Sequence, residues 1–293
     1  VLNYYAGSPE RLIGKQIPVA GGLDVTYHEP YGVVGIIVPW NFPMTIAAWG
    51  FAPALAAGNA VVLKPAELTP LTAVRLGELA LEAGLPEGLF QVIIGSGSVV
   101  GQRFVSHPDV HKVVFTGSTE VGTEVAAGCA QLLKPVTLEL GGKSANIVFA
   151  DADLEKAAAG VPGSVFDNAG QDCCARSRVL VERPAYDRFV EAFARRTEAI
   201  KVGAPLDEAT ERPDPAPAAG ELLIAVQACL LILGRGDTVM DAMRDFEGWD
   251  NVVVHPGDFP RTYDYEDEAG VVHRLDATLT VKHHQSPMPE RHA

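Results

Sequence analysis

Several features are missing from this sequence, and each absence excludes a class of protein. No apolar run reaches the ~18 residues that a membrane-spanning helix needs, so we expect no membrane association. Acidic residues outnumber basic ones by 37 to 23, and the net charge of −14 argues against affinity for nucleic acid or an anionic membrane. The four cysteines have no framework spacing, which favours a reducing, cytoplasmic setting.

The N-terminus also lacks an initiator Met and the basic-then-apolar layout of a signal peptide. We therefore expect a piece of a longer chain whose beginning lies upstream. The 293 residues, 47% of them apolar, suffice for one large domain or two of ordinary size with a sizeable core.

Short β-rich runs alternate with helical stretches through most of the sequence. A continuous apolar run typical of a buried strand occurs at 31–38, and further β-rich runs occur at 59–63, 90–94, 111–115, 145–149 and 178–182. Helical spacing or amphipathic patterning occurs at 70–83, 153–168 and 186–201. Strands separated by helices of this length imply right-handed crossovers. The pattern predicts the α/β class, with a doubly wound, mostly parallel, Rossmann-like sheet that binds its ligand at the carboxyl edge.

Composition changes at residues 212–220, where three alternating prolines indicate a junction. The segment from residue 212 to the end carries 14 acidic and 7 basic residues, and thus half of the net charge. It also holds five of the eight histidines, in no spacing that matches a zinc site. The apolar run 222–233 is of helical type. We expect an acidic tail that differs in kind from the preceding sequence and is partly disordered.

A cysteine and a glutamate are the first candidates for chemistry. Cys173 lies in the loop Asn168-Ala-Gly-Gln-Asp-Cys-Cys-Ala175, and Glu139 opens the run Glu-Leu-Gly-Gly-Lys-Ser. A thiol can attack an electrophilic carbon, and a carboxylate can activate the water that releases the adduct. We expect Glu139 to end a buried strand, where burial would raise its pKa towards the working range. A buried structural cysteine and a surface carboxylate remain the alternatives.

Three turns follow predicted strands and are candidates for ligand binding. Asn41 lies in Pro39-Trp-Asn-Phe-Pro43, where an Asn in a proline-flanked turn is the alternative. Phe115-Thr-Gly-Ser-Thr-Glu-Val-Gly122 opens a helix, so a pyrophosphate could lie at its N-terminus; a plain turn with a cap is the alternative. Lys64-Pro-Ala-Glu67 ends another strand, and a polar turn is the alternative.

Together and in this order, these motifs resemble the active-site signature of the NAD(P)-dependent aldehyde dehydrogenase superfamily, over residues 4–211. The resemblance implies oxidation of an aldehyde to a carboxylic acid through a cysteine thioester, with NAD as hydride acceptor. Cys173 would be the nucleophile, Glu139 the general base for hydrolysis, and Asn41 an oxyanion donor together with the backbone N–H of Cys173. Lys64 and Glu67 would bind the adenosine ribose; a carboxylate there repels a 2′-phosphate, which favours NAD over NADP.

The remaining cofactor contacts also come from the resemblance. They would be Val38, Pro39, Trp40, Gly97, Gly101, Phe115, Thr116, Gly117, Ser118, Val121, Gly122 and Leu140. No resident metal is implied. The partners would be a small-molecule aldehyde, with neither nucleic acid nor membrane. The family's homo-oligomer is not expected, because the segments that pair its subunits do not occur in this sequence.

The expected organisation has four parts. Residues 1–140 would form an NAD-binding domain, incomplete at its N-terminus, and 141–211 the start of the catalytic thiol domain. The proline-rich junction is 212–220, and the acidic tail is 221–293. Residues 221–282 weakly resemble the segment before the zinc-binding helix of Mlc-titration-factor-type zinc peptidases, without a His-Glu-x-x-His motif. A truncated, inactive dinucleotide-binding remnant, or a fusion with a peptidase-like tail, is the alternative to an active dehydrogenase.

Overall fold

The computed structural model describes residues 1–204 and 206–213, and beyond them only five short strands: 229–233, 252–254, 263–266, 272–275 and 281–283. The chain divides into two compact units, residues 1–141 and 142–293, which are described separately. In the described residues no helix has both the length and the apolar character needed to cross a membrane.

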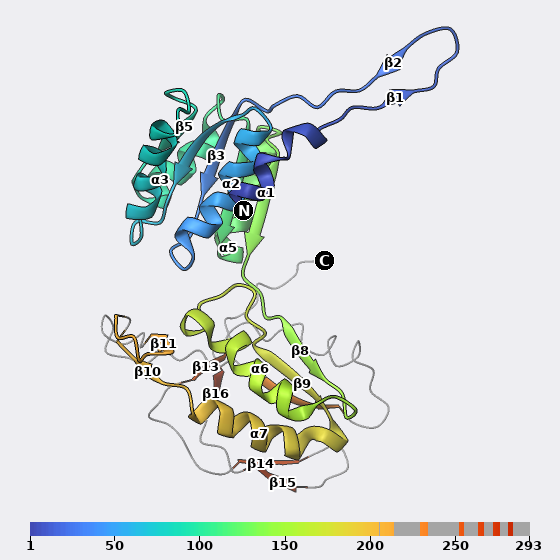
Figure 1. Ribbon diagram of the computed structural model, residues 1–293, viewed down its shortest axis with the longest axis vertical. Helices are drawn as coiled ribbons and strands as arrows, with labels where there is room; N and C mark the ends of the chain where they lie inside the picture. Colours follow the sequence, from blue (N-terminus) through green and yellow to red (C-terminus); the bar gives the residue numbers. More distant parts are fainter. Residues whose placement is uncertain are drawn as a thin grey trace, which may run out of the picture. The chain divides into compact units, whose positions relative to one another are not determined.

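The first unit is built on a five-stranded, all-parallel sheet (Figure 1). Its strands are β3 (Val33–Ile37), β4 (Ala60–Lys64), β5 (Phe90–Val92), β6 (Lys112–Gly117) and β7 (Val136–Leu140), in the spatial order β5-β4-β3-β6-β7. The chain runs outward from β3 to β5, then returns to the other side of β3 for β6 and β7. This reversal beside β3 is the switch point of a doubly wound sheet. The predicted α/β class is confirmed.

Helices cover both faces of this sheet. On one face, α2 (Pro43–Ala56) and α3 (Leu71–Glu82) pack on Ile36, Val61 and Leu63, none of which has exposed surface. On the other, α4 (Gln102–Ser106) and α5 (Thr119–Gln131) pack on Ile37 and Val113. Neighbours such as Ile36 and Ile37 face opposite cores because strand side chains alternate, so a strand covered on both sides needs a continuous apolar run.

Shorter elements complete the first unit. At the N-terminus lie α1 (Leu2–Ala6) and a 3₁₀ turn, η1 (Pro9–Arg11). The strands β1 (Gln16–Ile17) and β2 (Asp24–Val25) form an antiparallel hairpin that extends away from the sheet (Figure 1). Every residue from 9 to 31 is exposed. A π-helical turn, η2 (Gly97–Gly101), leads from β5 into α4. Predicted strands and helices of this unit are confirmed to within a few residues at each end.

A buried lysine closes the C-terminal end of α4. The Nζ of Lys134 donates to the carbonyls of Phe104, at 3.1 Å, and of His107, and burial lowers the pKa of this lysine. Helix C-termini leave carbonyls without partners within the helix. Lys134 therefore links the segment before β7 to α4.

Replacing Lys134 with methionine is expected to lower the free energy of unfolding by ~1–3 kcal/mol, because two carbonyls lose their donor inside the fold. Urea denaturation followed by circular dichroism would measure the change. The matched control is Lys15→Met, at an exposed position, where a change within ~0.5 kcal/mol is expected. Equal effects of the two substitutions would contradict the structural role of Lys134.

The second unit is built on a smaller parallel sheet. Its described strands lie in the order β12 (Cys229–Leu233), β9 (Arg178–Glu182), β8 (Ala145–Val148). Residues 229–233 were predicted as part of a helical run, and that prediction is wrong. A short apolar run cannot distinguish helix from strand, and here parallel pairing with β9 decides the structure. Residues 222–228 lie outside the described residues.

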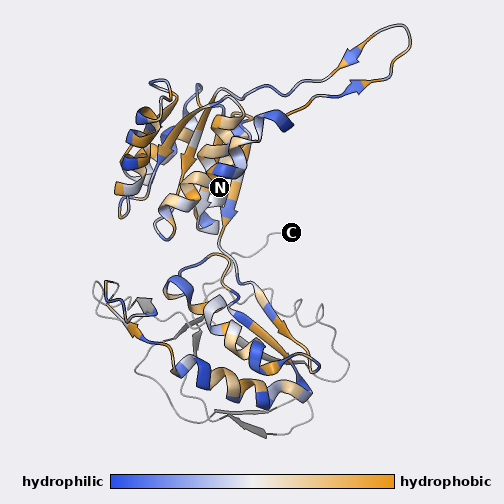
Figure 2. Cartoon of the chain, in the orientation of Figure 1, coloured by the Kyte–Doolittle hydropathy of each residue, from blue (hydrophilic) through white to orange (hydrophobic). Residues whose placement is uncertain are grey.

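Two helices pack on this sheet, α6 (Leu154–Phe166) and α7 (Tyr186–Glu198) (Figure 1). Figure 2 shows the amphipathic pattern of α7, with orange positions along one side and blue along the other. Phe189 is fully buried, and its ring stacks on that of Phe193 with centroids 6.0 Å apart. Predicted strands 145–149 and 178–182 and helices 153–168 and 186–201 are confirmed, with small differences at their ends.

The remaining described elements of this unit are short. They are the 3₁₀ turns η3 (Asp167–Gly170) and η4 (Arg183–Ala185), the parallel pair β10 (Val202–Gly203) and β11 (Arg212–Pro213), and two antiparallel pairs, β13 (Val252–Val254) with β16 (Val281–His283) and β14 (Tyr263–Glu266) with β15 (Val272–Leu275). The predicted disorder of the tail and the rest of the predicted junction lie outside the described residues.

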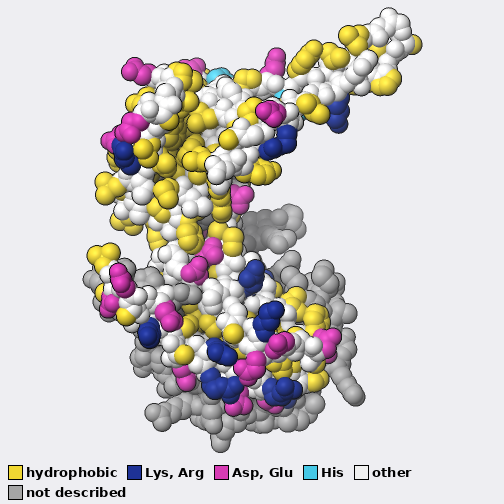
Figure 3. Space-filling view, viewed as in Figure 1, with side chains coloured by type: hydrophobic (Ala, Val, Ile, Leu, Met, Phe, Trp, Pro, Cys, Tyr) yellow, Lys and Arg dark blue, Asp and Glu magenta, His cyan; other side chains and the backbone are white. Residues whose placement is uncertain are grey.

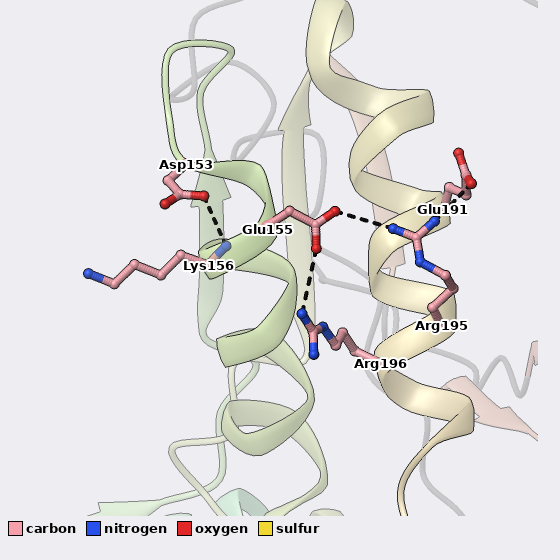
Figure 4. A network of polar contacts seen from close by, with 6 residues as sticks. All are labelled: Asp153, Glu155, Lys156, Glu191, Arg195 and Arg196. Carbon is pink, nitrogen blue, oxygen red and sulfur yellow. Dashed lines mark hydrogen bonds and ion pairs between the residues drawn. The ribbon is translucent and has the colours of Figure 1, made fainter.

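Ion pairs connect α6 to α7 on the surface of the second unit. Glu155 accepts from Arg195 at 3.2 Å and pairs with Arg196 at 3.6 Å, while Arg195 also pairs with Glu191 (Figure 4). Figure 3 shows these charges gathered over the two helices, whereas apolar side chains reach the surface over much of the visible face of the first unit. Exposed pairs of this kind contribute ~0–1 kcal/mol each, so the core beneath stabilises the unit.

Candidate active site

Four predicted site residues follow the central strand of the first unit. Val38 is buried directly after β3, and its N–H donates to the carbonyl of Lys64 at 3.1 Å. Pro39 is half-buried, Trp40 is exposed, and Asn41 is half-buried in the turn that leads into α2. This turn lies at the switch point, where the loops after β3 and β6 leave towards opposite faces of the sheet.

The turn from β6 into α5 has the form of an anion site. Ser118 is the N-cap of α5, and its Oγ accepts the N–H of Val121 at 3.3 Å. Phe115 and Thr116 are buried inside β6, and Gly117 ends that strand. A Cβ on Gly117 would come within 2.5 Å of the Phe115 ring, so only glycine fits. The N-terminus of a helix of 13 residues, with backbone N–H groups exposed beside a glycine, favours a negatively charged ligand.

Lys64 and Glu67 lie at the end of the neighbouring strand. Lys64 is only 4% exposed, and its Nζ donates to the carbonyl of Pro65 at 3.0 Å. Burial lowers the pKa of Lys64, and the negative charge of Glu67 partly opposes that change. Glu67 itself is exposed beyond the strand. One strand further on, the turn Gly97–Gly101 begins at the sheet edge and ends with Gly101 buried.

Glu139 and Leu140 lie on β7, one of the two edge strands of the sheet. The prediction that Glu139 ends a buried strand is wrong, because β7 pairs with β6 alone among the described strands and the Glu139 side chain is exposed. Leu140 is half-buried against α5, where a Cβ on Gly122 would come within 2.5 Å of its Cδ2. The close approach of α5 to β7 thus depends on Gly122.

Cys173 belongs to the second unit and lies in a loop with an unusual backbone. Three successive residues, Asn168, Ala169 and Gly170, have positive φ angles of 47°, 57° and 75°. For an alanine this left-handed conformation costs ~1–2 kcal/mol, and such strain concentrates at functional sites. Cys173 follows three residues later and is half-buried. Its carbonyl oxygen packs closely on Gly142, where an added Cβ would lie only 3.3 Å from that oxygen.

Burial and two neighbouring side chains raise the pKa of Cys173. Its Sγ lies 3.7 Å from that of Cys174, and the N–H of Cys174 donates to Oδ1 of Asp172 at 2.9 Å. Burial, together with the thiol of Cys174 and the charge of Asp172, raises the pKa of Cys173 to about 11. The thiol form therefore predominates at neutral pH. This influence of Asp172 and Cys174 on the Cys173 thiol is not among the sequence predictions, although the three residues are adjacent in the sequence.

The rate at which iodoacetamide alkylates Cys173 is expected to depend steeply on pH when a chelator keeps metal ions off the thiols. The thiolate is the reacting form, so a pKa raised to about 11 should keep the rate rising through pH 10. Cys174→Ala removes the neighbouring thiol that helps to raise the pKa, and should shift the profile to lower pH. Iodoacetamide labelling with peptide mass mapping would measure both rates. A wild-type rate that levels off below pH 9 would contradict this account.

Comparison with known proteins identifies the family. Residues 1–213 match the sequence profile described as "Aldehyde dehydrogenase family". The chain belongs to the aldehyde dehydrogenase family. Human mitochondrial aldehyde dehydrogenase is 50% identical over 214 residues, which are 72% of this chain and 41% of that protein. Human cytosolic 10-formyltetrahydrofolate dehydrogenase is 49% identical over 71% of this chain and 24% of its own length.

Solved structures agree with the assignment of this aldehyde dehydrogenase family member. The crystal structure of PnpE in complex with nicotinamide adenine dinucleotide is 44% identical, with a TM-score of 0.69 over 71% of this chain and 43% of PnpE. The chain thus spans a quarter to about two fifths of the length of these relatives.

Residues 217–288 match a second profile, "Glucose-regulated metallo-peptidase M90", as the predicted zinc-peptidase resemblance of the tail indicated.

Proposed function

We propose that this chain oxidises an aldehyde to a carboxylic acid with NAD as hydride acceptor, through a thioester on Cys173. One observation carries the proposal. The loops after β3, β4, β5 and β6 all begin at the carboxyl edge of a doubly wound sheet, and they hold most of the predicted cofactor residues. That edge is where such sheets bind dinucleotides.

The residues at this edge fit NAD. The N-terminus of α5 at Ser118 suits a pyrophosphate, and Gly117 leaves the backbone open to it because it has no side chain. Lys64 and Glu67 suit the ribose hydroxyls. The exposed carboxylate of Glu67 would repel a 2′-phosphate, which favours NAD over NADP. When bound, NAD supplies the acceptor for a hydride.

The residues of the chain would perform the remaining chemistry. Cys173 Sγ loses its proton and bonds to the aldehyde carbon, giving a thiohemiacetal whose oxyanion is stabilised by the Asn41 amide and the Cys173 backbone N–H. Loss of the hydride leaves a thioester. Glu139 takes a proton from water, which attacks the thioester and releases the acid and the thiol. Aldehyde, NAD⁺ and water thus become acid, NADH and a proton.

Binding of NAD to the first unit gives the proposal its first test. Gly117→Val is expected to weaken NAD binding at least ~100-fold, because its side chain would clash with the Phe115 ring and occupy the path of the pyrophosphate. Isothermal titration calorimetry on the full chain would measure the affinity. Gly22→Val, in the exposed loop between β1 and β2, is the control, because Gly22 has no positive φ angle and no atom lies closer than 3.9 Å to its Cβ position. Unchanged affinity of Gly117→Val would contradict the assigned cofactor site.

A second candidate function is dinucleotide binding without turnover. Two observations favour it. The carboxylate of Glu139 is exposed to solvent, and the raised pKa of Cys173 keeps its sulfur in the thiol form, which is not the nucleophile. NAD binding without NADH formation from any of a panel of aldehydes would identify such a remnant. A fusion with a peptidase-like tail is the third possibility, although the sequence contains no His-Glu-x-x-His.

We propose the organisation that follows from this function. Residues 1–140 would bind the cofactor, residues 141–211 would supply the thiol, and 212–220 would join them to the acidic tail. The acidic composition and unpatterned cysteines support a cytoplasmic enzyme whose partner is a small aldehyde. Size-exclusion chromatography with light scattering would test the expected absence of the family's homo-oligomer.

A further inference from the structure

The turn that holds Cys173 also gathers three potential metal ligands. The Sγ atoms of Cys173 and Cys174 and a carboxylate oxygen of Asp172 all lie within 4.8 Å of one another. All three residues belong to the second unit, and each has exposed surface, with Cys174 the most open. An ion from solvent can therefore reach the cluster.

The spacing of the two sulfurs suits a tetrahedral metal. Two zinc–sulfur bonds of about 2.3 Å at a tetrahedral angle require sulfurs about 3.8 Å apart. The observed separation is 3.7 Å. An aspartate oxygen at a zinc–oxygen distance of about 2.0 Å would lie about 3.5 Å from each sulfur, which the cluster also permits.

Backbone hydrogen bonds hold the three ligands in one turn. Oδ1 of Asp172 accepts the N–H of Cys174 at 2.9 Å, and the carbonyl of Asp172 accepts the N–H of Ala175 at 3.1 Å. The N–H of Arg176 donates to the carbonyl of Ser164, at 3.0 Å, which anchors the end of the turn on α6. The Asp172 carboxylate keeps a second oxygen for an ion. The ligands are thus largely preorganised.

We propose that Asp172, Cys173 and Cys174 form a binding site for a thiophilic divalent cation of the Zn²⁺ class, with water completing the tetrahedron. Two thiolates select Zn²⁺ or Cd²⁺ over Mg²⁺ and Ca²⁺, which prefer oxygen ligands. Binding forms two metal–sulfur bonds and releases the two thiol protons, without oxidation or reduction. A bound ion blocks the sulfur of Cys173. That consequence for turnover rests on the proposed function, whereas the site itself does not.

Cadmium binding to the chelator-treated full chain tests the site without NAD or aldehyde. We expect a thiolate-to-cadmium absorption band that saturates at one ion, is displaced by Zn²⁺ and persists in excess Mg²⁺. Cys173→Ser and Cys174→Ser should each weaken binding at least ~100-fold, and Asp172→Asn at least ~10-fold. Cys129→Ser and Cys229→Ser are the matched controls and should keep the band; Cys129 is buried in the first unit.

A second readout covers the case in which a variant fails to fold. In the wild-type chain, saturating Zn²⁺ should slow iodoacetamide labelling of Cys173 and Cys174 at least tenfold, and a chelator should restore it. Persistence of the cadmium band in Cys174→Ser, its absence from the wild type, or unprotected labelling would overturn the proposal. Inhibition of NADH formation by Zn²⁺ bears on the proposed function, and the binding result stands apart from it.

Discussion

Cys173→Ala is expected to reduce aldehyde-dependent NADH formation at least ~10⁴-fold while NAD still binds with wild-type affinity. The alanine removes the only atom proposed to bond to the substrate carbon, and the remaining parts of the site cannot replace a nucleophile. Cys173 is none of the residues proposed to bind the cofactor, so the substitution should not alter NAD affinity. Steady-state NADH absorbance and calorimetry on the same sample would measure the two quantities.

Two controls accompany this substitution. Cys229→Ser changes a cysteine on β12, outside the proposed machinery, and should keep NADH formation within a few-fold of wild type. Circular dichroism of Cys173→Ala should match the wild type, because the side chain is only half-buried. Undiminished NADH formation in Cys173→Ala would exclude this thiol as the nucleophile.

Glu139→Gln is expected to separate the two halves of the reaction. The amide cannot take a proton from water, so hydrolysis of the thioester should slow by ~10²–10⁴-fold while its formation continues. Rapid mixing with NAD and aldehyde should then give a burst of one NADH per active chain, followed by almost no turnover. Stopped-flow absorbance would resolve the burst from the steady state.

The matched control for this substitution is Glu124→Gln, at an exposed position on α5 of the same unit. It makes the same change of charge and should keep turnover unchanged. If Glu139→Gln loses the burst together with the steady state, Glu139 acts before the thioester forms, and the role of water-activating base would be excluded.

The central strands of the sheet could be predicted from sequence because helices cover them on both faces. The run 31–38 contains no polar or charged residue apart from the hydroxyl of Tyr31, and the structure confirms a strand within it, β3. The turns at Asn41 and Ser118 were also predictable, since each follows a strand and opens a helix. Local patterns of this kind depend on neighbouring residues alone.

Features that depend on distant segments were not predictable. Glu139 has apolar neighbours on both sides, yet β7 is an edge strand because, of the strands that the structure describes, only β6 pairs with it. Residues 229–233 became a strand through pairing with β9, about fifty positions earlier in the chain. The positive φ angle of Ala169 could not be predicted from the sequence, because alanine rarely adopts that conformation.

The central claim is that the chain forms a thioester at Cys173, and peptide mass spectrometry of an acid-quenched reaction tests it most directly. Wild-type chain mixed with NAD and a reactive aldehyde should show the acyl group on the Cys173 sulfur. No such adduct should form without NAD, and Glu139→Gln should accumulate more of it. Formation of NADH with no acyl group on Cys173, or with the group on Cys174 instead, would contradict the account.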